Sequence, residues 1–249
     1  MSSPDWKLDK SQARLDDGTL SASLDLAQPT RGLYDISPFF TQHPQSRLLQ
    51  IVEPEIGADG VGPSDSYLRS RDLIVTYPET DSRRYSLEVY WRSLASEPPQ
   101  VHRGVELIVS AQTSTLDATP RVTVRSTLPA GQFASLPAAG PTARSVPIET
   151  AGTTTFDTDA GPGCFIFRPP GAEFSYVEMV HPTDFQRCDI SEADGGEATA
   201  EHLLIRRWME KGVIVRARMR ACFVQRDGDL TSARACYDSL CHDRLPLTV

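Results

Sequence analysis

Apolar and polar residues alternate with a period of two along much of this chain, the pattern of β-strands with one buried face. The segment TLSASLDL, residues 19–26, is the first clear example, and RRYSLEVYWRSL (83–94) and GVELIVSAQT (104–113) repeat it. VIVRARMRACFV, residues 213–224, is the most regular. Strands separated by modest turn-rich loops are typical of antiparallel sheets. The pattern therefore predicts a mostly β chain, an antiparallel β-sandwich or the larger supersandwich.

Further strands are predicted at RVTVRST (121–127), CFIFRP (164–169) and FSYVEMVH (174–181). The segment YLRSRDLIVTYPE (67–79) is interpreted as one strand that ends at Pro78. Residues 202–225 fit a hairpin turning at 210–212, or else a short helix followed by a strand. The sequence favours the hairpin.

A single helix is expected near the C-terminus. Asp229 is a plausible N-cap for LTSARACYDSLC (230–241), where one apolar stripe recurs at helical spacing. Residues 128–163 are rich in Ala, Pro, Gly and Thr and are interpreted as an extended excursion within one domain that spans 1–249.

Composition places the chain among soluble globular proteins, with 39% hydrophobic and 23% charged residues. The formal net charge of −8 disfavours nucleic acid or an anionic membrane as a partner, because both attract positive surfaces. No apolar run approaches the ~20 residues of a membrane span, and the charged N-terminus lacks a signal-peptide core. A cytoplasmic protein is expected. Its five cysteines form no CxxC pair and are expected to be reduced thiols.

Motifs for common chemistries are missing. There is no phosphate-binding glycine loop, HExxH, GxSxG or EF-hand loop in the sequence. The five histidines are scattered, so no metal site, cofactor or catalytic residue is assigned.

The densest group of reactive side chains lies in YVEMVHPTDFQRC, residues 176–188. Glu178 and His181 are three apart, so they point to opposite faces unless the strand ends near Val180. The proline that follows His181 favours such an ending. A histidine and a carboxylate at a strand tip suit a general base and its orienting partner. The alternative is a structural histidine beside a solvated Asp184.

Arginines at alternate positions form a second group of candidates. Arg216, Arg218 and Arg220 share the face opposite the apolar one, spaced about 6.6 Å apart. Arg69 and Arg71 are predicted to share a strand face in the same way. These arginines either pair with cross-strand carboxylates such as Glu88, Glu106 or Glu178, or form a platform for an anion or a sugar acid.

Two resemblances follow. The segments 65–94, 176–185 and 210–224 resemble a bacterial protein family of unassigned activity. The strand at 19–26 followed by TRGLYDI is similar to the start of galactose-mutarotase-like β-sandwiches, which implies that fold and an activity on sugars. That family carries an early Asn-His pair, whereas this chain contains no Asn.

Three functions remain open from the sequence. The favoured one is a non-catalytic binding protein with an arginine-lined sheet face. The alternative is a carbohydrate-active or sugar-phosphate enzyme of mutarotase-like architecture, and the third is a structural protein with charge networks. A sugar or a small anion is the expected ligand. The candidate ligand-binding residues are Arg69, Arg71, Glu178, His181, Arg216, Arg218 and Arg220.

Overall fold

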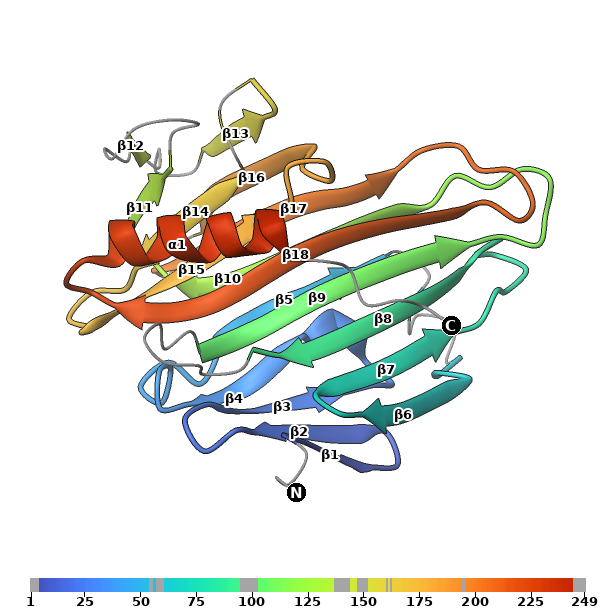
Figure 1. Ribbon diagram of the computed structural model, residues 1–249, viewed down its shortest axis with the longest axis horizontal. Helices are drawn as coiled ribbons and strands as arrows, with labels where there is room; N and C mark the ends of the chain where they lie inside the picture. Colours follow the sequence, from blue (N-terminus) through green and yellow to red (C-terminus); the bar gives the residue numbers. More distant parts are fainter. Residues whose placement is uncertain are drawn as a thin grey trace.

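In the part of the chain that the structure describes, two nine-stranded antiparallel sheets lie face to face in the computed structural model (Figure 1). The structure describes residues 5–53, 56, 61–94, 103–136, 144–146, 152–159, 161, 163–193 and 196–243. The predicted β-sandwich with one C-terminal helix is confirmed.

The first sheet has the strand order β1-β2-β3-β4-β5-β10-β17-β16-β13. Its strands are, in that order, Trp6–Asp9, Gln12–Asp16, Ser21–Asp25, Leu33–Ser37, Arg47–Val52, Arg121–Pro129, Glu197–Arg206, Arg187–Ala193 and Thr153–Asp157. A short 3-10 helix, Pro29–Arg31, precedes β4.

The second sheet has the order β12-β11-β14-β15-β18-β9-β8-β7-β6. Its strands are, in that order, Arg144–Val146, Gln132–Ser135, Cys164–Arg168, Phe174–Val180, Ile214–Gln225, Arg103–Gln112, Ser86–Ser93, Asp72–Tyr77 and Asp65–Arg69. The chain thus crosses repeatedly between the sheets.

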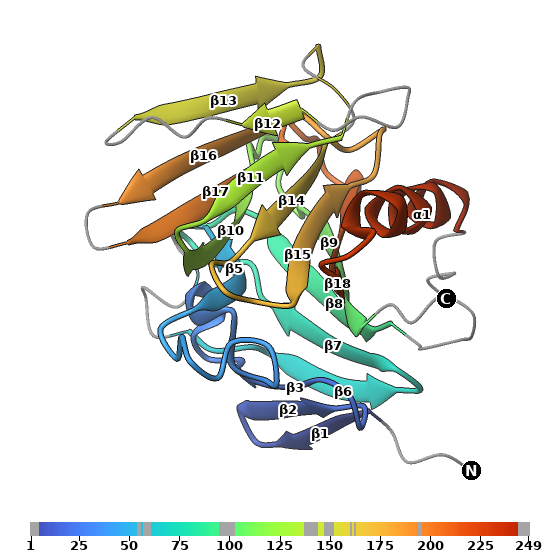
Figure 2. The same cartoon turned by 90° about the vertical axis from the view of Figure 1, so that its left-hand side faces the viewer.

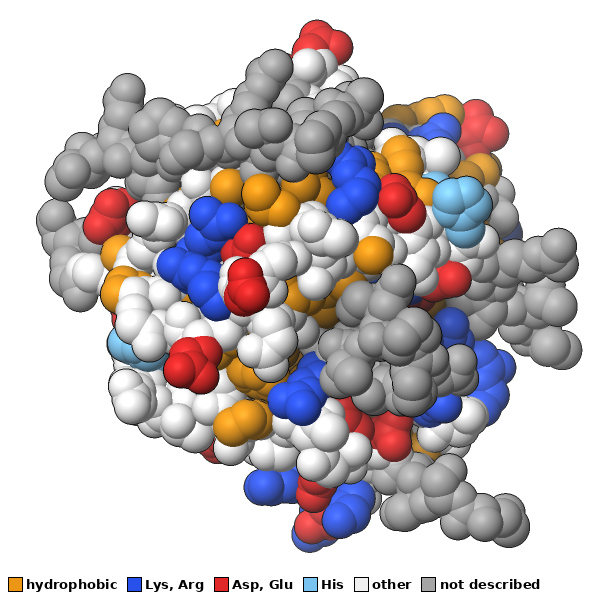
Figure 3. Space-filling view, turned by 60° about the vertical axis from the view of Figure 1, so that its left-hand side comes forward, with side chains coloured by type: hydrophobic (Ala, Val, Ile, Leu, Met, Phe, Trp, Pro, Cys, Tyr) orange, Lys and Arg blue, Asp and Glu red, His pale blue; other side chains and the backbone are white. Residues whose placement is uncertain are grey.

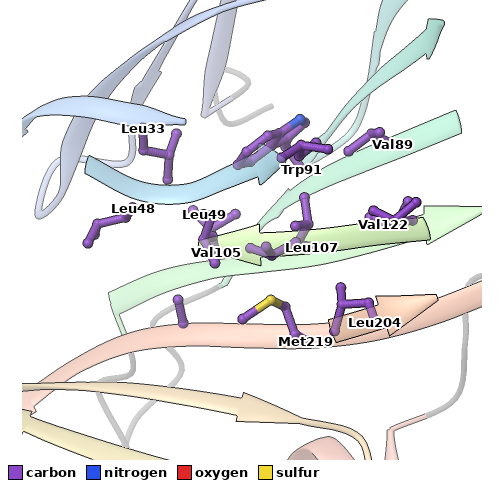
Figure 4. Close-up of a cluster of buried hydrophobic side chains, with 14 of the residues drawn as sticks. Leu33, Leu48, Leu49, Val89, Trp91, Val105, Leu107, Val122, Leu204 and Met219 are labelled. Atoms are coloured by element: carbon purple, nitrogen blue, oxygen red, sulfur yellow. The ribbon is translucent and has the colours of Figure 1, made fainter. Parts of the chain in front are cut away.

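The core fills the space between the sheets with the apolar sets that the alternation predicts. Leu107 and Val105 of β9 and Trp91 of β8 face side chains of the first sheet such as Leu49 and Val122 (Figure 4). In β18 the odd positions from Ala217 to Phe223 are buried in this core, as expected. The even positions therefore lie on the outer face of the second sheet.

Helix α1, Asp229–His242, packs on that outer face over β14, β15 and β18 (Figure 2). Its apolar stripe meets the outward side chains of those strands in a second cluster that includes Val177, Met179 and Cys222. Its N-cap is Gly228, so the N-cap prediction for Asp229 is wrong. Asp229 instead occupies the first turn and pairs with Arg168.

The segment 67–79 corrects another expectation. It contains a hairpin of β6 and β7, joined by the two-residue turn Ser70–Arg71, rather than one strand. Ser70 adopts a left-handed φ of 56°, which suits a tight hairpin turn. Arg69 ends β6 while Arg71 lies in the turn, so the prediction that they share a strand face is wrong.

The hairpin interpretation of 202–225 is wrong. A turn without a helix does join β17 to β18, but the two strands belong to different sheets and do not pair, because the chain crosses from one sheet to the other there. Within the 128–163 excursion the structure contains the short strands β11, β12 and β13. Residues 137–143 and 147–151 lie outside the described part, and the single-domain assignment stays a prediction.

The surface mixes both signs of charge. On the face shown in Figure 3, basic and acidic side chains lie in small interspersed groups instead of one large field. Among the described residues, no helix has the length and apolar character to span a membrane.

Candidate functional site

A polar cleft of about 480 Å³ opens on the outer face of the second sheet. It lies at the ends of β7, β8 and β9, beside the C-terminal end of α1. The residues that line it are Ser70, Arg71, Asp72, Arg92, Ser93, Leu94, Glu106, Arg220 and Asp243.

A row of alternating charges crosses five strands of this sheet, and four of its five members line the cleft. Arg69, Asp72, Arg92, Glu106 and Arg220 are directly opposite one another in the pairings β6–β7, β7–β8, β8–β9 and β9–β18. Opposite charges at facing positions stabilise a sheet, whereas like charges would destabilise it. We call these five residues the charged row.

Ion pairs fix the geometry of the charged row. Arg92 donates two hydrogen bonds to Asp72, of 2.7 and 3.0 Å, and Arg69 lies 3.8 Å from the same carboxylate. Arg220 donates to Glu106 Oε2 at 3.1 and 2.6 Å, and to Asp243 Oδ2 at 2.7 Å. Fork-shaped guanidinium contacts of this kind hold both partners in a defined plane.

These contacts keep the arginines charged. The hydrogen bond to Asp72 is the main reason that the pKa of Arg92 is raised. Burial lowers the pKa of Arg220, but the charge of Glu106 and the hydrogen bonds to Asp243 and Glu106 outweigh burial and raise it. The cleft is therefore lined by positively charged guanidinium groups of Arg92 and Arg220.

A second, less polar row runs parallel to the charged row. Tyr67, Ile74, Tyr90, Ile108 and Arg218 occupy facing positions on the same five strands. Tyr90 is buried between Ile74 and Ile108, while Tyr67 on the edge strand is exposed. Aromatic and ionised side chains thus lie next to each other on one sheet face.

The three arginines of β18 have separate partners. Arg220 pairs with Glu106, as the cross-strand hypothesis expected. Arg218 donates hydrogen bonds of 2.8 Å to the carbonyls of Leu240 and Asp243, at the end of α1. Arg216 donates to Ser110 Oγ at 3.1 Å. Of the three, only Arg220 lines the cleft.

Glu178 and His181 do not come together. Strand β15 ends at Val180 as expected, but the side chain of Glu178 lies between the sheets. It accepts hydrogen bonds from Ser126 and from Tyr176 (2.9 Å), and its Oε2 lies 2.9 Å from Nε2 of His202.

This buried group links the two sheets, because Ser126 and His202 belong to the first and Glu178 to the second. Cys188 Sγ lies 3.8 Å from His202 Nε2, and burial, followed by the charge of Glu178, raises the pKa of its thiol. The arrangement is buried between the two sheets.

His181 lies in the loop after β15, half-buried, with Nδ1 2.8 Å from Thr183 Oγ1. Burial, followed by the charge of Arg218, lowers its pKa. Among the described residues no group of three or more His, Cys, Asp or Glu side chains is arranged to hold a metal ion.

Of the residues that line the cleft, sequence reasoning identified Arg71 and Arg220 but missed Asp72, Arg92 and Asp243; Arg69 belongs to the charged row but does not line the cleft. The sequence predicted Glu106 only as a cross-strand pairing partner. The alternation of polar and apolar residues indicates which side chains lie on the polar face of each strand. Only the register between the strands shows that these polar side chains lie opposite one another.

The fold is that of the galactose-mutarotase-like β-sandwiches, and the resemblance noted from the opening strand is confirmed. A candidate aldose 1-epimerase from Escherichia coli K12 aligns with a TM-score of 0.59 at 10% identity, over 85% of this chain and 98% of that one. A galactose mutarotase related enzyme from Lactobacillus acidophilus gives 0.59 at 6% identity, over 86% and 97%. A candidate mutarotase from Salmonella typhimurium gives 0.54 at 9%, over 89% and 93%. No family model and no curated protein matches the sequence.

Proposed function

We propose that this protein acts on a sugar that carries an anionic group, and that the reaction is interconversion of its anomers in the cleft. The charged row is the observation that carries the proposal. The carbohydrate-active hypothesis gains over a non-catalytic binder because the solved structures of this fold carry names of sugar epimerases and mutarotases. Fold alone does not give function, so the proposal rests on the cleft.

Sugar hydroxyls both donate and accept hydrogen bonds, and the charged row offers carboxylate acceptors beside guanidinium donors. Arg71 lies exposed at the β6–β7 turn above the row, where its guanidinium fork suits a phosphate or a carboxylate. The exposed ring of Tyr67 offers an apolar face for the sugar ring. Together these groups suit a sugar phosphate or a sugar acid.

Anomers interconvert when the pyranose ring opens and closes. A base must take the proton of the C1 hydroxyl while the ring oxygen gains a proton. Asp243 is the most exposed carboxylate of the cleft, and its Oδ2 accepts a hydrogen bond from Arg220. We assign Asp243 as the base, and water in the cleft as the proton source for the ring oxygen.

The test follows fresh α-anomers by polarimetry and by proton NMR, with and without the protein. Glucose, glucose 6-phosphate and galacturonate form the panel. We expect faster equilibration for the anionic sugars. Asp243→Asn should remove the acceleration. Sugar binding should be kept, because the substitution leaves the backbone carbonyl of residue 243, which Arg218 contacts, in place.

Arg71→Ala should weaken binding of the anionic sugars roughly tenfold and leave glucose nearly unaffected, since one charge-assisted contact is lost. Arg14→Ala is the matched control, because Arg14 is an exposed arginine of β2 in the other sheet. Binding without acceleration would return the protein to the class of non-catalytic binders. Neither binding nor acceleration across the panel would refute the proposal.

A further inference from the structure

Two loops that are far apart in sequence form one end of the molecule. The loop from β9 to β10 and the loop from β17 to β18 project side by side, at the right of Figure 1. Ala118 and Met209 exchange backbone hydrogen bonds of 3.2 and 2.8 Å, and Trp208 Nε1 donates to Asp117 Oδ1 at 2.7 Å. These contacts hold the two loops as one unit.

The end of this unit is apolar. Leu116 is 78% exposed, Ile214 56%, Trp208 55% and Val213 39%. In the described part of the chain only six large hydrophobic side chains are exposed; Leu116, Trp208 and Val213 are on the two loops, and Ile214 begins β18 directly after the second loop. We call these four residues the apolar tip. Burying four such side chains elsewhere in the fold would have been favourable, so their shared exposure points to a partner.

Basic residues surround the apolar tip. Arg121, Arg206, Arg207 and Lys211 are all exposed, and none forms a salt bridge within the described residues. Arg121 and Arg206 are directly opposite each other in the β10–β17 register. Like charges at facing positions destabilise a sheet. This pair therefore costs stability, and we call the four residues the basic rim.

We propose that the apolar tip and the basic rim form a peripheral docking site for an anionic lipid surface. A protruding tip with tryptophan and aliphatic side chains suits insertion at the boundary between headgroups and acyl chains. The arginines and the lysine around it suit lipid phosphates. A nucleic acid would stack its bases on the Trp208 ring, but it offers no apolar surface to cover the exposed Leu116 and Ile214. A second copy of this chain docked at the same site would bring two basic rims together, and their like charges would repel.

The local field here is opposite to the net charge of −8, from which the sequence predicted no membrane partner. The acidic residues on or against the two loops include Asp117, which is bound to Trp208, Glu210, and Glu79, which accepts hydrogen bonds from Ser114. Gln112, the last residue of β9, follows Glu106 by six positions, and six positions along a strand span about 20 Å. Docking by the tip would therefore leave the cleft open to the aqueous side.

Tryptophan fluorescence provides a direct test. The chain has three tryptophans, and Trp6 and Trp91 are each only 1% exposed. A shift in emission on adding vesicles therefore reports on Trp208. Vesicles with equal parts phosphatidylcholine and phosphatidylglycerol should shift the emission to shorter wavelength and should carry the protein down on sedimentation. Pure phosphatidylcholine should do neither, and high salt should reverse the binding.

The variants separate the two parts of the site. Arg206→Ala with Arg207→Ala should weaken vesicle binding roughly tenfold or more without loss of stability, because a like-charge pair is removed. Leu116→Ser with Ile214→Ser should weaken it comparably, and both side chains are exposed in the folded protein. Lys7→Ala with Arg14→Ala removes two exposed basic residues that face each other on β1 and β2, and should change nothing.

No emission shift and no sedimentation with the anionic vesicles would overturn the inference. Unchanged binding by either double variant of the tip and rim would do the same. A shift with soluble polyglutamate but not with vesicles would assign the surface to an acidic polypeptide, and would also overturn it. None of these outcomes depends on sugar turnover.

Discussion

Arg220 and Glu106 face each other on neighbouring strands β18 and β9, joined by two hydrogen bonds of 3.1 and 2.6 Å, with both side chains buried. A buried ion pair gives little net stability, but removing one partner leaves an uncompensated charge. The pair therefore fixes the geometry of the cleft floor. The protein loses stability when one partner is removed, although the intact pair adds little.

Glu106→Gln should lower the free energy of unfolding by about 3 kcal/mol, the lower end for a broken buried pair, since Asp243 still contacts Arg220. Urea denaturation measures this loss. Replacing both partners, Glu106→Leu with Arg220→Met, should lower the free energy of unfolding by less than the single change, because neither charge of the pair remains buried without its partner. A double variant that is less stable than Glu106→Gln would contradict this explanation.

Arg218 connects the sheet to the end of α1 through the carbonyls of Leu240 and Asp243. Arg218→Met keeps the apolar stem but removes both donors, and should cost about 1 to 2 kcal/mol. Hydrogen exchange should accelerate at the amides of the last helical turn. Arg216→Met is the matched control, since Arg216 donates to Ser110 instead of the helix. Equal exchange in both variants would refute the capping role.

Asp229 in the first turn of α1 accepts two hydrogen bonds of 2.8 Å from Arg168 and one of 2.6 Å from Ser175. Burial raises the pKa of this carboxyl, but the hydrogen bonds from Arg168 and Ser175 outweigh burial and lower it. A carboxyl with a depressed pKa stabilises the folded state above its unfolded pKa of about 4. That stability is lost as the pH falls through the folded pKa.

Asp229→Asn should therefore destabilise the protein by about 2 kcal/mol at neutral pH, and the difference from the parent should shrink below about pH 4. Chemical denaturation at several pH values measures it. Asp238→Asn is a suitable control, since Asp238 is an exposed residue of the same helix. A difference that stays constant down to pH 2 would show that Asp229 stabilises the fold by packing rather than by charge.

The sequence by itself determined the class of fold and the two faces of most strands. In β18, for example, Ala217, Met219 and Phe223 could be assigned to the core because alternation decides which side chains avoid water. The same reasoning predicted the C-terminal helix and its buried stripe at Ala233, Tyr237 and Leu240. These features depend only on local period and hydrophobicity.

Tertiary structure alone decided which polar residues meet. Asp72, Glu106 and Arg220 form one row because turn lengths and hydrogen-bond register align strands that are far apart in sequence. Glu178 turned inward to His202, 24 residues away in the chain, instead of to nearby His181. A strand's sequence shows which side chains share a face, but the partner strand that lies opposite is chosen by packing of the whole sandwich.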